Sequence, residues 1–147
     1  MMNEKPKKVL VFGTFDSLHE GHRHFFRQAK ELGGYLLVVV ARDSSIKVNK
    51  GRNSFEKEGV RLRKVMAVNC VDEVQLGNEW PTDDPYQLLG ELEFDVLALG
   101  YDQKPDEATV RQELDQRGRE RVKMVRLKPY NPDKYKSSYI RPPAVVY

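Results

Sequence analysis

Short apolar runs alternate with amphipathic segments along this chain. The run KVLVFGT, residues 8–14, is continuous and closes on a small turn, which is typical of a strand buried in a parallel sheet. In the segment that follows, Phe25, Ala29 and Leu32 recur at the i, i+4, i+7 spacing of one helix face, and a Gly-Gly pair comes next. The pattern therefore predicts a strand followed by a helix.

The same alternation continues along the chain. Further strands are predicted at residues 35–41, 71–77, 94–100 and 122–127, and further helices at residues 55–69, 84–93 and 105–118. Residues 42–54 are polar and basic and are interpreted as a loop. Because strands and helices alternate without a linker, we expect one α/β domain over residues 1–147. Its architecture would be a Rossmann-like, parallel five-stranded sheet with helices on both faces.

Polar clusters follow four of the predicted strands. In open parallel sheets, ligands bind beyond the carboxyl ends of the strands, where the strand order reverses. The clusters are GTFDSLHEGH at residues 13–22, ARDSSIKVNKGR at 41–52, GYDQ at 100–103 and YKSSYIR at 135–141. Four clusters at four strand ends predict one shared ligand site.

The cluster at residues 13–22 has the residue types of an anion site. Gly13 lets the chain turn sharply out of the strand. Gly21 lets a phosphate approach the helix start, where N–H groups and the helix dipole favour anions. His19 and His22 are one turn apart, so both imidazoles can donate an N–H to a phosphoryl oxygen as charge develops there. The alternative is that the histidines only cap or pack the helix.

This stretch resembles the GxFDxxHxGH signature of the cytidylyltransferase-like nucleotidyltransferases, which are relatives of class I tRNA synthetases with their HIGH motif. Every fixed position is present, namely Gly13, Phe15, Asp16, His19, Gly21 and His22. Further along, VVVARDSSIKVNKGR, RLRKVMAVNCVDEV, DVLALGYDQ and VRLKPYNPDKYKSSYI resemble segments of the small archaeal-type FAD synthases. The resemblance covers nearly the whole chain and implies the HIGH-motif nucleotidyltransferase fold.

The resemblance also implies a role for each matching residue. The catalytic residues would be His19, His22, Lys50 and Arg61, with Lys47 as the alternative to Lys50. The nucleotide would be bound by Gly13, Thr14, Phe15, Asp16, Gly21, Gly100, Tyr101, Asp102, Ser137 and Ser138. Taken singly, the basic residues between positions 47 and 52 could instead be a solvated loop, and the two serines a helix cap.

The implied reaction is in-line attack by an acceptor phosphate on the α-phosphorus of a nucleoside triphosphate, with pyrophosphate leaving. Nucleotidyl transfer depends on positioning and charge neutralisation, which fits a site of His, Lys, Arg and Gly without a Ser-His-acid arrangement. A divalent metal, Mg²⁺ or alternatively Mn²⁺ or Co²⁺, is expected to bridge phosphate oxygens. Asp16 is its candidate ligand, although this carboxylate could instead orient the loop.

The choice of acceptor depends on the segment after the last predicted strand. Cytidylyltransferases that act on glycerol phosphate or phosphocholine carry an arginine there, where this chain has Pro129 and Tyr130. Tyr130 could stack on a flat acceptor ring, which favours an FMN adenylyltransferase that makes FAD from ATP and FMN. One alternative is a CTP-dependent cytidylyltransferase for a small phosphorylated alcohol or sugar. Another, from a different class, is a non-catalytic nucleotide sensor.

The composition of the chain limits the kinds of ligand and the cellular compartment that we expect. A net charge of +3 over 147 residues suits an anionic small molecule and is too small to indicate nucleic acid. No apolar run approaches a membrane span or a signal peptide. The single cysteine, Cys70, fits a reducing compartment and is expected to be a small buried side chain. We therefore expect a cytoplasmic protein.

Relatives of the resembled family are often dimers, so a homodimer is expected, with Trp80 as a candidate contact.

Overall fold

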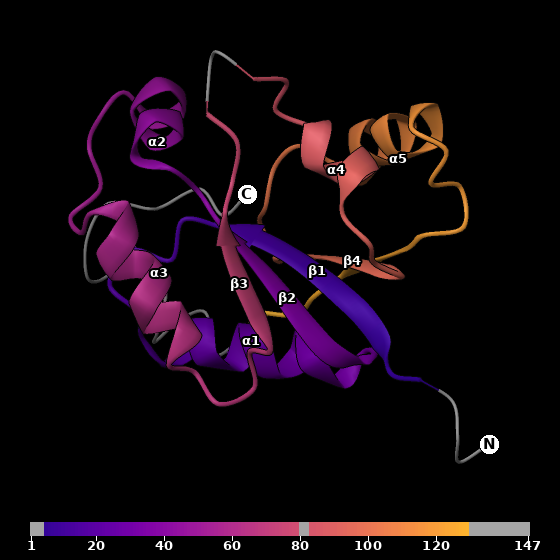
Figure 1. Cartoon of the computed structure of the whole chain (residues 1–147), viewed down its shortest axis with the longest axis horizontal. Coiled ribbons are helices and arrows are strands. Elements are labelled where there is room, and N and C mark those ends of the chain that lie inside the picture. The colour runs from indigo at the N-terminus through magenta and orange to yellow at the C-terminus, as the bar shows by residue number, and fades with distance from the viewer. Residues whose placement is uncertain (1–4, 80–82, 130–147) are drawn as a thin grey trace.

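A computed structural model describes residues 5–79 and 83–129, which form a five-stranded, fully parallel sheet (Figure 1). The strands are β1 Lys7–Gly13, β2 Gly34–Val40, β3 Glu73–Leu76, β4 Val96–Leu99 and β5 Lys123–Arg126. Their order across the sheet is β3-β2-β1-β4-β5. The central position of β1 suits its sequence, because Val9, Leu10 and Val11 are fully buried, as expected of a strand with both faces covered.

Helices cover both faces of this sheet. Their bounds are α1 Glu20–Glu31, α2 Asp43–Lys50, α3 Glu58–Met66, α4 Gln87–Glu91 and α5 Glu107–Gln116. The helices α1 and α3 lie on one face, and α4 and α5 lie on the other (Figure 1). The predicted Rossmann-like α/β architecture is confirmed, and all five strands fall where the apolar runs predicted them.

Two separate apolar cores lie on the two faces of the sheet. Successive side chains of a strand point to opposite faces, so one continuous apolar run can contribute side chains to both cores. On one face, Val11 belongs to the same core as Phe26 of α1 and Val65 of α3. On the other face, Leu10 belongs to the core that includes Leu89 of α4. The runs from Val9 to Phe12 in β1 and from Leu36 to Val40 in β2 are therefore continuously apolar rather than alternating.

The helix α2 corrects the sequence-based prediction of a loop over residues 42–54. Ile46 is its buried apolar anchor, and Gly51 follows the last turn in the left-handed conformation, with φ of 71°. One buried apolar side chain is too weak a signal for helical periodicity to show. The helix α3 is also shorter than predicted, because Phe55 and Glu56 contact the loop after β1 instead of extending the helix.

The strand β1 separates from β4 at the carboxyl end of the sheet. It pairs with β2 along its whole length, from Lys7 to Gly13, but with β4 only at Val9 and Leu10. The strand β4 stays paired with β5 as far as Leu99. Because the strand order reverses between β1 and β4, this opening is the topological switch point at which α/β sheets bind ligands.

Four further expectations from the sequence have different outcomes. Cys70 is half-buried rather than fully buried, and burial raises the pKa of its thiol. Among the described residues, no helix combines the length and the apolar character that crossing a membrane requires. The cytoplasmic location and the single domain over residues 1–147 stay predictions.

Candidate active site

The loop after β1, residues 14–19, folds around the ring of Phe15. A Cβ on Gly13 would lie 2.4 Å from Cζ of this ring, so a glycine is required there by close approach. Phe15 and Ser17 have positive φ angles of 53° and 56°, a conformation that costs non-glycine residues roughly 1–2 kcal/mol each. Packing of the Phe15 ring against Phe26, at a centroid distance of 4.8 Å, and edge-on against His22, at 5.7 Å, stabilises this shape.

His19 and His22 form a reciprocal cap at the start of α1. Nδ1 of His19 accepts a hydrogen bond from the backbone N–H of Gly21 at 3.0 Å, and Nδ1 of His22 accepts one from the backbone N–H of His19 at 3.3 Å. The two rings stack with centroids 4.0 Å apart. A neutral imidazole whose Nδ1 accepts carries its proton on Nε2. The cap thus holds both rings in the tautomer that donates from Nε2, which suits a phosphate oxygen.

Asp16 connects the loop after β1 to the segment before α3. Its carboxylate accepts hydrogen bonds from the backbone N–H groups of Phe55, at 2.7 Å, and Glu56, at 2.9 Å. Glu56 in turn accepts from the backbone N–H of Ser17 at 2.9 Å. These contacts match the loop-orienting alternative for Asp16. No group of three or more His, Cys, Asp or Glu side chains within the described ranges could hold a metal, and the metal-ligand role of Asp16 stays a prediction.

Arg61 lies beneath the same loop and is fully buried. Its guanidinium donates to the carbonyls of Thr14, at 2.9 Å, and Glu56, at 3.0 Å, and to the carboxylate of Asp43 at 2.7 Å. Burial acts to raise the pKa of Asp43, but the hydrogen bonds from Arg61 and from the backbone of Glu58 hold it below its ordinary value. Arg61 therefore fastens α2 and α3 to the loop, and its predicted contact with a phosphate stays a prediction.

Lys50 ends α2 and reaches the loop after β1 from the other side. Its ammonium donates to Oγ1 of Thr14 at 3.2 Å. Burial, with smaller contributions from Arg52 and Arg61, lowers the pKa of Lys50 to about 8, although Asp16 acts in the opposite direction. The alternative lysine at position 47 is exposed. The contact with the loop therefore favours Lys50 over its neighbour as the phosphate-binding lysine.

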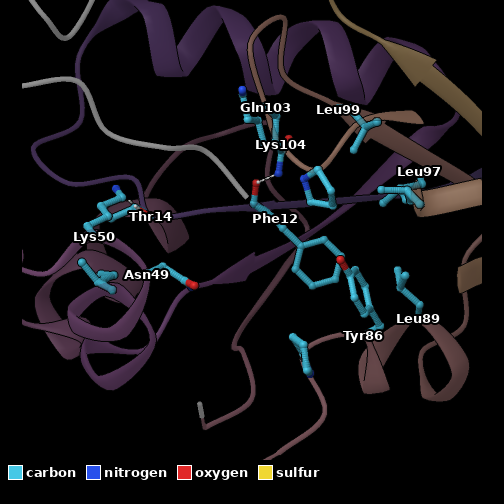
Figure 2. A pocket seen from close by; sticks show the side chains of 14 residues that line it. Phe12, Thr14, Asn49, Lys50, Tyr86, Leu89, Leu97, Leu99, Gln103 and Lys104 are labelled. Atoms are coloured by element: carbon cyan, nitrogen blue, oxygen red, sulfur yellow. Dashed lines mark hydrogen bonds between the residues drawn. The ribbon is translucent and has the colours of Figure 1, made fainter. Parts of the chain in front are cut away.

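A cavity of about 410 Å³ lies at the opening between β1 and β4 (Figure 2). Ligand sites commonly have volumes of about 300–1,000 Å³, so this cavity is large enough for a small molecule. Its apolar walls include Ile46, Pro85, Tyr86, Leu89, Leu97, Leu99 and Val110. Its polar residues include Thr14, Asn49 and Lys50, which gather at one end, away from Leu89 and Leu97 (Figure 2). The cavity therefore has a polar end beside the loop after β1 and an apolar end beside α4.

The turn after β4 borders this cavity. The backbone N–H of Gly100 donates to Oε1 of Gln103 at 2.9 Å, and Nε2 of Gln103 donates to the carbonyl of Phe12 at 3.2 Å. Arg126, at the end of β5, donates to the carbonyls of Gly100, at 2.6 Å, and Gln103, at 2.9 Å. The turn is thus tied to both of its neighbouring strands.

The structure brings together most residues that the sequence predicted for the site. The loop with its two histidines, Lys50 and the turn at residues 100–103 all lie at the carboxyl edge of the sheet. Tyr101 and Asp102 are exposed on that turn, and their contact with a nucleotide stays a prediction. Tyr130, Ser137, Ser138 and Trp80 lie outside the described residues.

Sequence reasoning missed the side chains that shape the cavity and support the loop. Tyr86 was read as part of an ordinary helix, although an aromatic residue directly after Pro85 at a short helix start was a usable signal. Asp43 and Glu56 support the loop from distant segments. Nothing in the local pattern around these two carboxylates distinguishes them from surface residues.

A helix start at the switch point of a parallel sheet occurs in several enzyme classes, and sequence comparison separates them. Residues 10–142 match the family model described as Cytidylyltransferase-like. The chain therefore belongs to the cytidylyltransferase-like family, and the predicted nucleotidyltransferase class is confirmed.

Individual relatives within this family are more specific. The FAD synthase of Thermoplasma acidophilum is 40% identical and the match covers 91% of each chain. The FAD synthase of Korarchaeum cryptofilum is 41% identical, and the match covers 95% of this chain and 93% of the relative. Among solved structures, the lipopolysaccharide core biosynthesis protein of Thermoplasma volcanium has a TM-score of 0.78 at 37% identity, covering 86% of this chain and 100% of that one. The resemblance to archaeal FAD synthases is confirmed.

Proposed function

We propose that this protein is an FAD synthase, which transfers the AMP group of ATP to the phosphate of FMN. A phosphate oxygen of FMN attacks the α-phosphorus of ATP, and the bond from the α-phosphorus to the bridging oxygen of pyrophosphate breaks. The proposal is supported by the similarity to FAD synthases over most of the chain. It is also supported by the chemistry of the cavity between β1 and β4.

The cavity is the observation that favours FMN over a small phosphorylated alcohol. Its volume of about 410 Å³ and its apolar walls suit a large flat ring. Glycerol phosphate is too small to cover the apolar walls of this cavity, and the part it leaves uncovered would stay in contact with water, which is unfavourable. Tyr86 also lines the cavity and offers an aromatic face for stacking.

The polar end of the cavity suits the phosphates. Lys50 and Thr14 lie there, beside the loop after β1, where an acceptor phosphate would meet the α-phosphorus of ATP (Figure 2). We assign to Nε2 of His19 and His22 the donation of hydrogen bonds to the oxygens that gain charge in the transition state. Catalysis of this kind needs positioned donors and no covalent intermediate.

The divalent metal is part of the proposal. Mg²⁺ in such sites is held mainly by substrate phosphate oxygens and water, with one or two carboxylates, and when bound it would neutralise phosphate charge. Both oxygens of Asp16 accept backbone N–H groups. We therefore propose that the metal enters with ATP and that the main role of Asp16 is to hold the loop.

Product formation with a panel of substrates tests the reaction. ATP or CTP is combined with FMN, glycerol phosphate or phosphocholine, and with Mg²⁺, Mn²⁺ or Co²⁺, while pyrophosphate release and FAD are measured. We expect FAD from ATP and FMN, and no release with the small acceptors. Turnover of CTP with a phosphorylated alcohol would replace the proposal with the cytidylyltransferase alternative. Absence of release from every pair would favour the nucleotide sensor.

Substitution of Tyr86 tests the acceptor cavity directly. Tyr86→Ala should raise KM for FMN about tenfold, because it removes a stacking face, while KM for ATP stays within about twofold of the wild type. Tyr86→Phe keeps the ring and should behave like the wild type. Tyr35, at the amino end of β2 and away from the cavity, provides the matched control Tyr35→Ala. An unchanged KM for FMN in Tyr86→Ala would place the acceptor elsewhere.

A further inference from the structure

A side chain takes the place of a backbone hydrogen bond between β1 and β4. In the register set by Leu10 and Leu97, the parallel ladder would continue with the N–H of Gly100 donating to the carbonyl of Phe12. Instead, Oε1 of Gln103 accepts from the Gly100 N–H at 2.9 Å, and Nε2 of Gln103 donates to the Phe12 carbonyl at 3.2 Å. The carboxamide therefore bridges the two strands at the point where they separate.

This bridge gives the Gly100 N–H and the Phe12 carbonyl hydrogen-bond partners where the two strands no longer pair directly. Gln103 is 5% exposed and lines the cavity, and Figure 2 shows its bond to the Phe12 carbonyl. Backbone N–H and carbonyl groups that are buried without partners destabilise a fold, so neighbouring strands normally pair until they reach water. The Gln103 amide satisfies both the Gly100 N–H and the Phe12 carbonyl, so these two groups do not require β1 and β4 to pair directly.

The opposite side of the turn is also fixed. Arg126 donates to the carbonyls of Gly100 and Gln103 and forms an ion pair with Glu107 of α5. The end of β4 is therefore held to β5 while the Gln103 amide spans the gap to β1. The two sides of the opening are thus a set distance apart.

We propose that Gln103 is a positioning residue that sets the width of the opening between β1 and β4 and thereby favours a flat acceptor ring. The proposal rests on the proposed function only in taking FMN as the ligand that reports on the opening. Tyr86, Leu97 and Leu99 line the cavity whose opening Gln103 spans. Loss of the bridge should therefore weaken FMN binding more than ATP binding.

The variant Q103E tests the bridge through its protonation state. An ionised carboxylate accepts from the Gly100 N–H but repels the Phe12 carbonyl, whereas a protonated carboxyl group can make both bonds. We expect Q103E to bind FMN at least about tenfold more weakly than the wild type at pH 8. The ratio of the two dissociation constants should fall toward one as the pH is lowered to 5. Binding is measured by quenching of FMN fluorescence in the presence of a non-hydrolysable ATP analogue.

The other charged groups near the opening are the same in the wild type and in Q103E. Lys50 and Lys104 line the same cavity, and Arg126 and Glu107 hold the turn. Measuring the wild type at every pH removes their contribution from the ratio. The control Q112E places the same charge change on the exposed surface of α5 and should give a ratio near one throughout. A Q103E ratio that does not change with pH would overturn the proposal.

A second variant, Q103M, separates bridging from volume. Methionine has a similar length and can make neither hydrogen bond, so Q103M should weaken FMN binding at all pH values. Without ligand, the Gly100 amide should exchange with solvent faster in Q103M than in the wild type, as measured by NMR. Binding by Q103M equal to that of the wild type would overturn the proposal. If the wild type does not bind FMN, the proposed function fails, and the Gly100 exchange rate still decides the role of Gln103: unchanged exchange contradicts it.

Discussion

Polar side chains of the loop after β1 are oriented by hydrogen bonds to the backbone. His19 and His22 accept backbone N–H groups through Nδ1, and Asp16 accepts two more from residues 55 and 56. The same contacts that shape the loop therefore fix the tautomer of both rings. A substitution here changes a local structure and a hydrogen-bond donor together, so each test needs a variant that separates the two effects.

Replacement of His22 separates donation from capping. His22→Ala should lower kcat by about 10² or more with little change in ATP affinity, because the donor acts mainly in the transition state. His22→Asn supplies an amide that can still accept the N–H of His19, so it should be as slow but should recover roughly 1 kcal/mol of the stability that His22→Ala loses. Steady-state kinetics and urea unfolding measure the two effects. A normal kcat in His22→Asn would contradict the role as a donor.

Lys50 should make ATP use depend on pH. Its pKa of about 8 means that the free protein loses this positive charge as the pH rises through 8. Because triphosphate binding favours the ammonium form, kcat/KM for ATP should fall above pH 8. Lys50→Arg keeps its charge and should abolish that fall, and Lys50→Ala should weaken both binding and rate. A pH–rate series measures this, with Lys47→Ala as the comparison: a fall in kcat/KM there would transfer the role to Lys47.

At the scale of elements, α2 and α3 are attached to the loop after β1 by one buried guanidinium. Arg61→Met should destabilise the fold by about 3 kcal/mol, the low end for a broken buried ion pair because Asp43 is partly exposed. Since the pKa of Asp43 is lowered in the fold, the stabilisation is present above its ordinary pKa and is lost as the pH falls through and below that value. The difference between wild type and variant should therefore narrow in acid.

Urea unfolding at neutral and acid pH measures this difference. Arg63 lies on the same helix with an exposed side chain, so Arg63→Met should change the unfolding free energy by less than about 0.5 kcal/mol. Equal stability of Arg61→Met and Arg63→Met would contradict the attachment. A large loss of ATP affinity in a stably folded Arg61→Lys variant would instead support the predicted phosphate contact.

Two glycines should respond in opposite ways to alanine. Gly59 lies in α3, and a Cβ there would meet Nη1 of Arg63 at 3.7 Å, an ordinary contact, so Gly59→Ala should stabilise the protein by about 0.5–1 kcal/mol. A Cβ on Gly13 would meet the Phe15 ring at 2.4 Å, so Gly13→Ala should cost about 1–3 kcal/mol. Thermal unfolding measures both. A neutral Gly13→Ala would mean that the loop does not depend on this close approach.

At the scale of the whole molecule, the proposed ligand would occupy the cavity between β1 and β4 and should hold the two halves of the sheet together. At a hundredfold excess over its dissociation constant, a ligand stabilises the folded state by about 2.7 kcal/mol, which raises Tm by roughly 5–10 °C in a chain of this size. FMN with a non-hydrolysable ATP analogue should produce such a shift. Glycerol phosphate is the control, and an equal shift with it would count against the acceptor cavity.

The homodimer also stays a prediction at this scale. Its candidate contact, Trp80, lies outside the described residues. Sedimentation equilibrium of the wild type and of Trp80→Ala addresses it. A monomer at every concentration would exclude the dimer.

Local sequence patterns predicted the elements whose formation depends on residues close to one another in the chain. The five apolar runs became the five strands, and His19 and His22 stand at a helix start as their spacing implied. The missed helix α2 has one buried apolar residue, Ile46, so its hydrophobic pattern was too sparse to recognise. Periodic burial and helix-start hydrogen bonds involve residues within a few positions of one another, and a sequence can be read for them directly.

The sequence by itself determined the α/β class, the loop after β1 and the nucleotidyltransferase signature. The tertiary structure decided that Lys50 rather than Lys47 meets the loop, that the Arg61 guanidinium is buried, and that Gln103 bridges β1 and β4. It also decided the cavity, whose walls come from positions as distant as Phe12 and Val110. Such contacts depend on the order β3-β2-β1-β4-β5 and on where two strands part. Strand order is set by packing between distant segments, which hydrophobic periodicity along the chain does not encode.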